Sequence, residues 1–200
     1  MDQTHPYNGS LTAEQFLFYE IRIAAMYYVR GLKIEEAIER IKKDNLFQYP
    51  TERQVSRLAR ACYKLDALGN EQLVHELASA PNEIAKQINL YAVMRYNSLV
   101  WEFMIQVIGE KYRNQDMNFS RKDMNAFFSR LQAQDDSVAA WSDATITKIK
   151  SVLVRMLIET GYLDGLKDTT LNPVFLCEEL ERGIEANNDY DALSAFNYFR

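Results

Sequence analysis

The sequence predicts an all-α fold, a multi-helix bundle, from three observations. Apolar residues recur at intervals of three and four along nearly the whole chain, which is the spacing of amphipathic helices. Only 7 glycines and 4 prolines occur among the 200 residues, so few positions interrupt a helix. With 48% hydrophobic residues the chain can bury a core, and this excludes disorder as its main state.

Residues 1–80 are expected to form an N-terminal domain with a helix-turn-helix-like unit. A first helix is expected over residues 12–30, because the glycine that follows suits the position after a helix end. A short second helix over residues 34–44 is followed by a loop that ends in Pro50, and the residue before a proline is pushed out of the helical region. A third helix over residues 51–68 completes the order of a helix-turn-helix unit.

Residues 81–200 are expected to form a second domain, made of a long central helix and a C-terminal winged-helix-like unit. Beyond residue 70, helices are expected over residues 71–80, 82–113, 120–134, 144–160, 174–185 and 190–199. The middle of the long helix is apolar on nearly every side, so other helices should surround it. Residues 162–171 contain two short extended stretches about a turn and predict one small β-hairpin, in the place of a wing.

Composition limits the functions that are open to the chain. The formal net charge is −5, which argues against a strongly basic protein that coats DNA without sequence preference. Any nucleic-acid surface must therefore be local. Cys62 and Cys177 lack metal-ligand spacing and indicate a reduced, cytoplasmic compartment. No secretory signal is visible, and the most apolar stretch, residues 99–108, is shorter than a membrane span and interrupted by Glu102, so no membrane partner is expected.

Catalysis, cofactors and metal ions are not expected. His5 and His75 are the two histidines, and neither has a recognisable catalytic partner in the sequence. The chain also has no glycine-rich phosphate loop and no cluster with metal-ligand spacing. The sequence therefore predicts a protein that is not an enzyme.

The strongest functional signal is the opposition of two faces on the helix over residues 51–68. Its cationic face carries Arg53, Arg57, Arg60 and Lys64, and its apolar face carries Val55, Leu58, Cys62 and Leu65. No acid lies three or four residues from these cations, and each pair of like-charged neighbours costs about 0.2–0.5 kcal/mol. A phosphate backbone would offset this cost, and pairing with Glu35, Glu36 or Glu39 of the preceding helix is the alternative.

A weaker signal lies in the helix over residues 144–160. Lys148, Ser151 and Arg155 fall on one side of this helix, and apolar residues line the other. Because only two of the three are cations, docking of a protein is favoured over DNA on sequence alone. Lys167, at the tip of the expected hairpin, could contact phosphate as wings do.

Several segments resemble the BrxA family of bacteriophage-exclusion (BREX) defence systems. The family's N-terminal signature resembles LFQYPTERQVSRLARACYKLDAL at residues 46–68. Its C-terminal signature resembles KIKSVLVRMLIETGYLD at residues 148–164, followed by Leu-Asn-Pro at residues 171–173. The similarity extends to Tyr91, Trp101, Phe103 and residues 118–123. It covers about residues 11–180 of the chain.

The resemblance implies a small, non-enzymatic, all-helical protein that binds double-stranded DNA and works with other proteins of a phage-defence system. The DNA contacts that it implies are Arg53, Arg57, Arg60, Lys64, Lys148, Ser151 and Arg155. Two alternatives stay open: an RNA-binding helical module of the antitermination kind, and a protein-protein adaptor within the defence complex. Neither a preferred DNA sequence nor an oligomeric state follows from the sequence.

Overall fold

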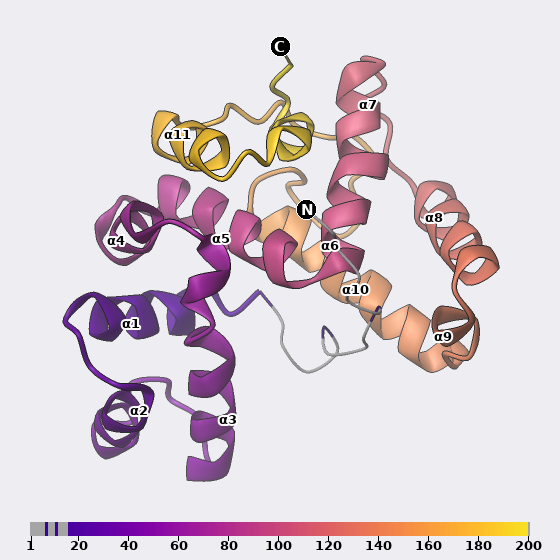
Figure 1. Ribbon diagram of the computed structural model, residues 1–200. Coiled ribbons are helices and arrows are strands. Elements are labelled where there is room, and N and C mark those ends of the chain that lie inside the picture. Colours follow the sequence, from indigo (N-terminus) through magenta and orange to yellow (C-terminus); the bar gives the residue numbers. More distant parts are fainter. Residues whose placement is uncertain (1–6, 8–10, 12–15, 200) are drawn as a thin grey trace.

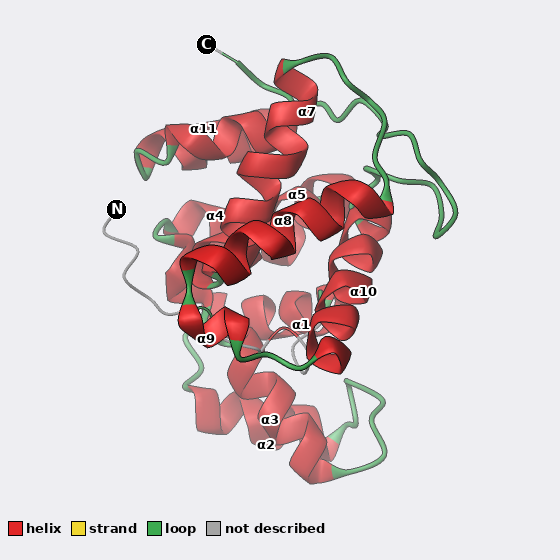
Figure 2. Ribbon diagram, turned by 90° about the vertical axis from the view of Figure 1, so that its right-hand side faces the viewer, coloured by secondary structure: helices red, strands yellow, loops and turns green. Residues whose placement is uncertain are grey.

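The computed structural model describes residues 7, 11 and 16–199, and it is mostly helical, with one long connection over residues 160–177 (Figures 1 and 2). The elements in chain order are α1 (Phe18–Val29), α2 (Ile34–Lys43), α3 (Glu52–Cys62), the 3-10 helix η2 (Leu65–Leu68), α4 (Glu71–Ser79), α5 (Asn82–Tyr96), α6 (Ser98–Phe103), the π-helix η3 (Met104–Gly109), α7 (Glu110–Arg113), α8 (Arg121–Gln134), α9 (Asp136–Ala139), α10 (Asp143–Glu159), α11 (Glu178–Ala186) and the 3-10 helix η4 (Tyr190–Phe196). The all-α class is confirmed, since the described residues form a single isolated β-bridge and no β-strand. Helices α2, α4, α8 and α10 begin and end within a residue or two of their expected bounds.

Helices α1, α2 and α3 form a unit with a small core of its own. That core comprises Tyr27, Ala37, Ile38, Ile41, Phe47, Val55, Leu58 and Ala59. In Figure 1, α2 is seen almost end-on beside the upright α3, so the two helices cross rather than run side by side. The expected start of the first helix at Thr12 lies outside the described residues. The described helix begins at Phe18, directly after Leu17 takes a left-handed φ of 45°.

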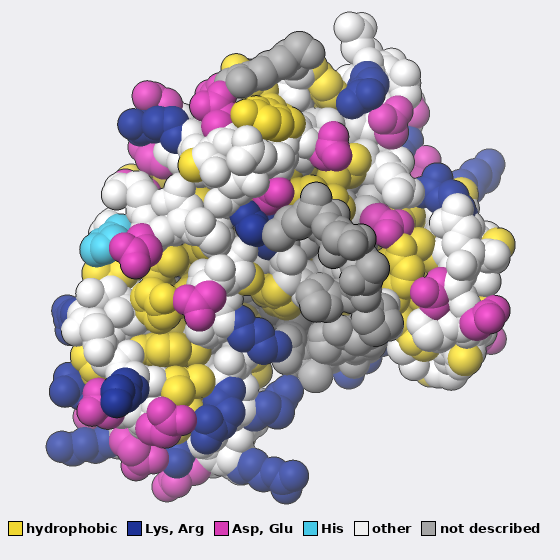
Figure 3. Space-filling view, in the orientation of Figure 1, with side chains coloured by type: hydrophobic (Ala, Val, Ile, Leu, Met, Phe, Trp, Pro, Cys, Tyr) yellow, Lys and Arg dark blue, Asp and Glu magenta, His cyan; other side chains and the backbone are white. Residues whose placement is uncertain are grey.

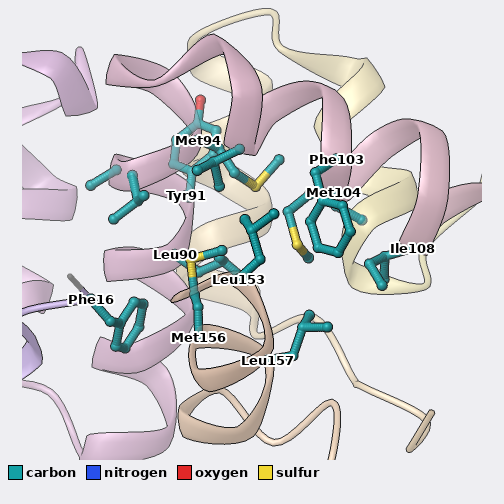
Figure 4. Packing of buried hydrophobic residues seen from close by; sticks show 14 of the residues in the cluster. Phe16, Leu90, Tyr91, Met94, Phe103, Met104, Ile108, Leu153, Met156 and Leu157 are labelled. Carbon is teal, nitrogen blue, oxygen red and sulfur yellow. The ribbon is translucent and has the colours of Figure 1, made fainter. Parts of the chain in front are cut away.

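The main core lies among the remaining helices and also includes part of α1. Its buried residues run from Leu11 to Phe196, so one core continues across the expected boundary at residue 80. Figure 4 shows side chains of α5, α6, η3 and α10 that converge there, among them Leu90, Phe103, Met104, Leu153 and Leu157. A division into domains at residue 80 stays a prediction.

The expected long central helix is interrupted at Asn97, and the prediction of one continuous helix was wrong. Asn97 ends α5 in an extended conformation, with φ −130° and ψ 103°. Its side-chain oxygen accepts a hydrogen bond from the Val100 N–H at 3.3 Å and so caps α6. A short amide side chain can compete with helical hydrogen bonds in this way. The apolar pattern runs on through the bend, which is why periodicity alone indicates a single helix.

The expected β-hairpin at residues 162–171 does not form. Its second half leaves the first and runs beside the segment before α8, where the Phe119 N–H donates to the Thr169 carbonyl at 2.8 Å. Its first half turns inward: Tyr162 is fully buried, and its hydroxyl donates to the Ala195 carbonyl at 2.9 Å. Near its end the segment returns to its start through one hydrogen bond, from the Asn172 N–H to the Tyr162 carbonyl at 2.9 Å, while the Thr169 carbonyl and the Leu171 N–H pair with the segment before α8.

The C-terminal helices are shorter than expected. Helix α11 begins at Glu178 rather than at residue 174, and the last element is the 3-10 helix η4. The short helix α9, which the sequence pattern did not predict, begins where the Asp135 side chain accepts hydrogen bonds from the Ser137 and Val138 N–H groups. In the described part of the chain, no helix combines the length and the apolarity needed to cross a membrane.

Candidate functional site

Helix α3 presents its cationic face to solvent. The Thr51 side chain starts the helix by accepting a hydrogen bond from the Gln54 N–H at 3.3 Å, and the apolar side of the helix is buried in the small core. Arg53, Arg57 and Arg60 are exposed, and together they are called the α3 surface below. Figure 3 shows Lys and Arg side chains gathered at the end of the molecule where α2 and α3 lie. The faces expected from the spacing of these residues are therefore real.

The acidic residues of α2 do not neutralise Arg53 or Arg60. Glu39 pairs with Lys42 of its own helix at 3.1 Å. Glu36 accepts a hydrogen bond from the backbone N–H at the start of α2, at 3.3 Å. Within the part of the chain that the structure describes, no ion pair joins Arg53 or Arg60 to a carboxylate. The alternative in which α2 absorbs the charge of α3 does not hold for these two arginines.

Arg57 lies close to a tyrosine and a carboxylate that are already paired. The Tyr49 hydroxyl donates to Oε1 of Glu20 at 2.8 Å. Burial, together with this hydrogen bond and the charge of Glu20, raises the pKa of Tyr49 to about 12, while the positive charge of Arg57 opposes the shift. Arg57 thus lies near Tyr49 and its carboxylate partner, a neighbourhood that the spacing of residues along α3 does not reveal.

The prediction of one helix over residues 51–68 was wrong at its C-terminal end, and Lys64 lies beyond α3; its contact with DNA stays a prediction. Helix α3 ends at Cys62, so Lys64 lies in the connection to η2, with its Nζ 5.8 Å from the ring centre of Tyr96. In a 3-10 turn, residues three apart lie above one another, and this lets Leu65 and Leu68 both enter the main core. The change from α3 to this tighter turn therefore goes with the burial of the two leucines, and Lys64 directly precedes it.

A second basic surface is a groove of about 1010 Å³ between the start of α8, helix α10 and residues 163–169. It is called the α10 groove below. The charged residues that line it are Arg121, Lys150, Arg155, Lys167 and Asp168. Ser151 also lines the groove, and its hydroxyl donates to the Thr147 carbonyl at 3.0 Å. Lys148 is exposed on α10 but does not line the groove, so the structure brings together two of the three residues predicted on this helix.

Sequence reasoning missed Arg121 and Lys150. The Lys150 ammonium donates to Oδ1 of Asn125 at 2.8 Å and lies 5.1 Å from the ring centre of Phe128, so contacts with α8 hold it at the groove. Its place was open to prediction, because residues 147, 151 and 154 lie on the same side of α10 at helical spacing. Arg121 could not be found this way, since it reaches the groove only through the packing of α8 against α10.

Among residues 7, 11 and 16–199, no group of three His, Cys, Asp or Glu side chains could hold a metal ion. His75 is exposed on α4.

The fold and these surfaces define a small all-helical protein with exposed cations on a three-helix unit and in a separate groove. The chain belongs to the BrxA family, whose model matches residues 5–188. It is 31% identical over 161 residues to BREX protein BrxA of Bacillus cereus (strain H3081.97), and the match covers 80% of each protein. It is 24% identical over 173 residues to BREX protein BrxA of Paramagnetospirillum magneticum, with 85% of each covered.

A solved structure has the same fold. The crystal structure of an uncharacterized protein from Magnetospirillum magneticum superimposes with a TM-score of 0.79 at 20% sequence identity. The match covers 96% of this chain and 98% of that one, so the two proteins share the fold along nearly their whole length. The family resemblance expected from the sequence is confirmed.

Proposed function

We propose that the protein binds double-stranded DNA through the α3 surface and the α10 groove, as a non-catalytic accessory component of a BREX phage-defence system. The observation that carries the proposal is the exposure of Arg53, Arg57 and Arg60 on a helix whose opposite side is fixed in a core. Membership of the BrxA family, with relatives named as BREX proteins, supports the place in phage defence.

Charge explains why the contact would be local. The whole chain carries a formal net charge of −5, so duplex DNA is repelled by most of the surface and attracted only where cations are concentrated. Arginine forms short, charge-assisted hydrogen bonds with phosphate oxygens, and such contacts supply affinity without reading bases. They would also remove the mutual repulsion of neighbouring arginines on α3, which costs about 0.2–0.5 kcal/mol per pair in the free protein.

The order of elements supports the same mode of binding. Helix α2, a turn and the cationic α3 follow one another as in a helix-turn-helix unit, where the second helix lies in the major groove. In the C-terminal part, α8 and α10 precede a projecting segment at residues 163–169, which takes the place of a wing although it forms no hairpin. We therefore assign α3 as the recognition helix and the α10 groove as a second contact.

A titration by mobility shift at several salt concentrations tests the proposal. If each arginine of the α3 surface neutralises one phosphate, the logarithm of the binding constant falls against the logarithm of salt with a slope of about −2.7 on duplex DNA; contacts from the α10 groove make the slope steeper, and on single strands it is shallower. Affinity that does not change with salt would remove the proposal. Competition between duplex DNA and a structured RNA distinguishes a DNA-binding protein from an RNA-binding module. The preferred ligand displaces the other at the lower concentration.

A second candidate function, a protein-protein adaptor, is favoured by one observation. A groove of about 1060 Å³ lies between η3, α7 and η4, and the aromatic side chains Tyr190 and Phe199 at its edge are exposed. Exposed aromatic groups beside a groove are typical of protein-docking sites. A variant that has lost DNA affinity but still captures a purified defence protein would favour this function over the first.

A further inference from the structure

An apolar side chain stands in solvent at the rim of the α10 groove. Leu166 is 72% exposed, whereas Leu163 and Leu171, on either side of it in the sequence, are each 2% exposed. Burial of a leucine side chain normally stabilises a fold, so the packing of the free protein gives no reason for its position. An exposed apolar group of this kind is available to a ligand.

The loop that presents Leu166 is fixed at its base and closed at its tip. The Asn172 side chain donates to Oδ1 of Asp164 at 2.8 Å and ties the two ends of the loop together. At the tip, the Asp168 N–H donates to the Gly165 carbonyl at 3.1 Å and closes a turn around Leu166. A side chain on a constrained loop loses little entropy when it inserts into a partner.

Cations from three elements line the same groove as Leu166. Arg121 comes from α8, Lys150 and Arg155 come from α10, and Lys167 adjoins Leu166 in the loop. One carboxylate, Asp168, lines the groove with them. An exposed apolar group in a groove lined by several cations matches proteins that wedge a side chain between base pairs while they hold the flanking phosphates.

We propose that Leu166 enters the minor groove of duplex DNA and partly unstacks one base step, while Lys167 and the cations of the α10 groove hold the flanking phosphates. This inference rests on the proposed function and adds a deformation of the DNA to it. Pyrimidine-purine steps such as TA unstack most easily, so the wedge gives a preference for them without hydrogen bonds to bases. An acidic amphipathic peptide is the other ligand that cations beside an apolar side chain would suit. The spread of the cations over three elements favours the longer, regularly charged duplex.

Fluorescence of 2-aminopurine tests the wedge, because this base brightens when it is unstacked. The probe is a duplex of about 30 base pairs with 2-aminopurine at a central TA step. The wild-type protein should raise the signal. Leu166→Ala, which changes no charge, should abolish the rise and weaken binding about 3- to 10-fold. Phe175→Ala is the matched control, since Phe175 is 80% exposed and does not line the groove, and it should behave as wild type.

The outcomes separate the wedge from DNA binding itself. Wild-type protein that binds the duplex and leaves the fluorescence unchanged overturns the wedge and leaves the proposed function standing. A Leu166→Ala variant that keeps the full signal does the same. Failure of the wild type to bind any duplex overturns the proposed function and the wedge together. A further outcome is that an acidic peptide displaces the duplex and that Leu166→Ala weakens binding of the peptide but not of the duplex. This result assigns the groove to a protein partner and contradicts the inference.

Discussion

Arg95 and Asp189 form a buried ion pair between α5 and the segment that follows α11. Nη1 of Arg95 lies 3.0 Å from Oδ2 of Asp189, and their side chains are 10% and 6% exposed. The Tyr91 hydroxyl donates to the same carboxylate oxygen at 2.7 Å, and the Asn187 amide donates both to that hydroxyl and to the Leu68 carbonyl, at 2.9 and 2.7 Å. The network therefore joins η2 to the C-terminal segment through α5.

Replacement of Asp189 by Asn should destabilise the protein strongly. The Arg95 guanidinium would stay buried without a countercharge, and breaking a buried ion pair in this way typically costs about 3–5 kcal/mol. Denaturant unfolding measures the loss. The double variant Arg95→Met/Asp189→Leu removes both charges and should recover most of it, whereas a double variant as unstable as the single one would mean that the pair itself stabilises the fold.

Gly183→Ala should destabilise the protein, although the same change in an open helix position stabilises. Alanine is favoured over glycine by about 1 kcal/mol inside helices. Here an added Cβ would lie 2.5 Å from Cδ1 of Leu73, a fully buried residue of α4. Overpacking of this kind costs about 1–3 kcal/mol, so the net effect should be a lower unfolding free energy. Shortening the opposing side chain in Leu73→Ala/Gly183→Ala should make the two effects non-additive, and strict additivity would show that the residues do not meet.

Lys111 holds two carboxylates and should make stability depend on acid pH. Its Nζ lies 3.1 Å from Oδ2 of Asp116 and 2.9 Å from Oδ1 of Asp123. The hydrogen bond from Lys111 leads the causes that lower the pKa of Asp116. Burial alone would raise the pKa of Asp123, but hydrogen bonds from Lys111 and Ser120 outweigh it and lower that pKa as well.

The sign of the effect follows from those directions. A carboxyl group whose pKa falls on folding contributes stability above its ordinary pKa of 3.8, and that stability is lost as the pH drops through the folded value. Lys111→Met should therefore flatten the decline of unfolding free energy between about pH 4 and about pH 2. Lys122→Met, which removes an exposed lysine of α8, is the control and should leave the slope unchanged. A steep decline in both variants would contradict the assignment.

Local spacing predicted the elements whose faces are set by neighbouring residues. The two faces of α3 follow from a period of 3.6 residues, and the caps at Thr51 and Ser120 follow from side chains that accept hydrogen bonds from the first turn. The bend at Asn97 did not follow, because apolar residues continue on both sides of it. The failed hairpin at residues 162–171 has a similar cause, since its partner strand is the remote segment before α8.

The candidate site likewise has parts that local spacing predicts and parts that depend on tertiary packing. Exposure of Arg53, Arg57 and Arg60 was predictable from one helix, whereas the place of Lys64 beyond the end of α3 goes with the change to a tighter turn. The α10 groove was not predictable as a whole. It needs Arg121 from α8 beside Arg155 from α10, and only tertiary packing brings those two together.

The salt dependence of DNA binding by Arg53→Ala/Arg60→Ala tests whether the exposed arginines of α3 contact DNA phosphates. Neither arginine pairs with a carboxylate in the described part of the chain, and Arg53 lies in the first turn of α3, where a positive charge is unfavourable, so the variant should fold at least as stably as wild type. Arg113→Ala/Arg182→Ala removes the same charge from exposed positions away from both basic surfaces and is the control. The first variant should bind duplex DNA more weakly, with a salt slope reduced by about 2, whereas the control should keep the wild-type slope. Equal slopes for the two variants would contradict the proposed contact.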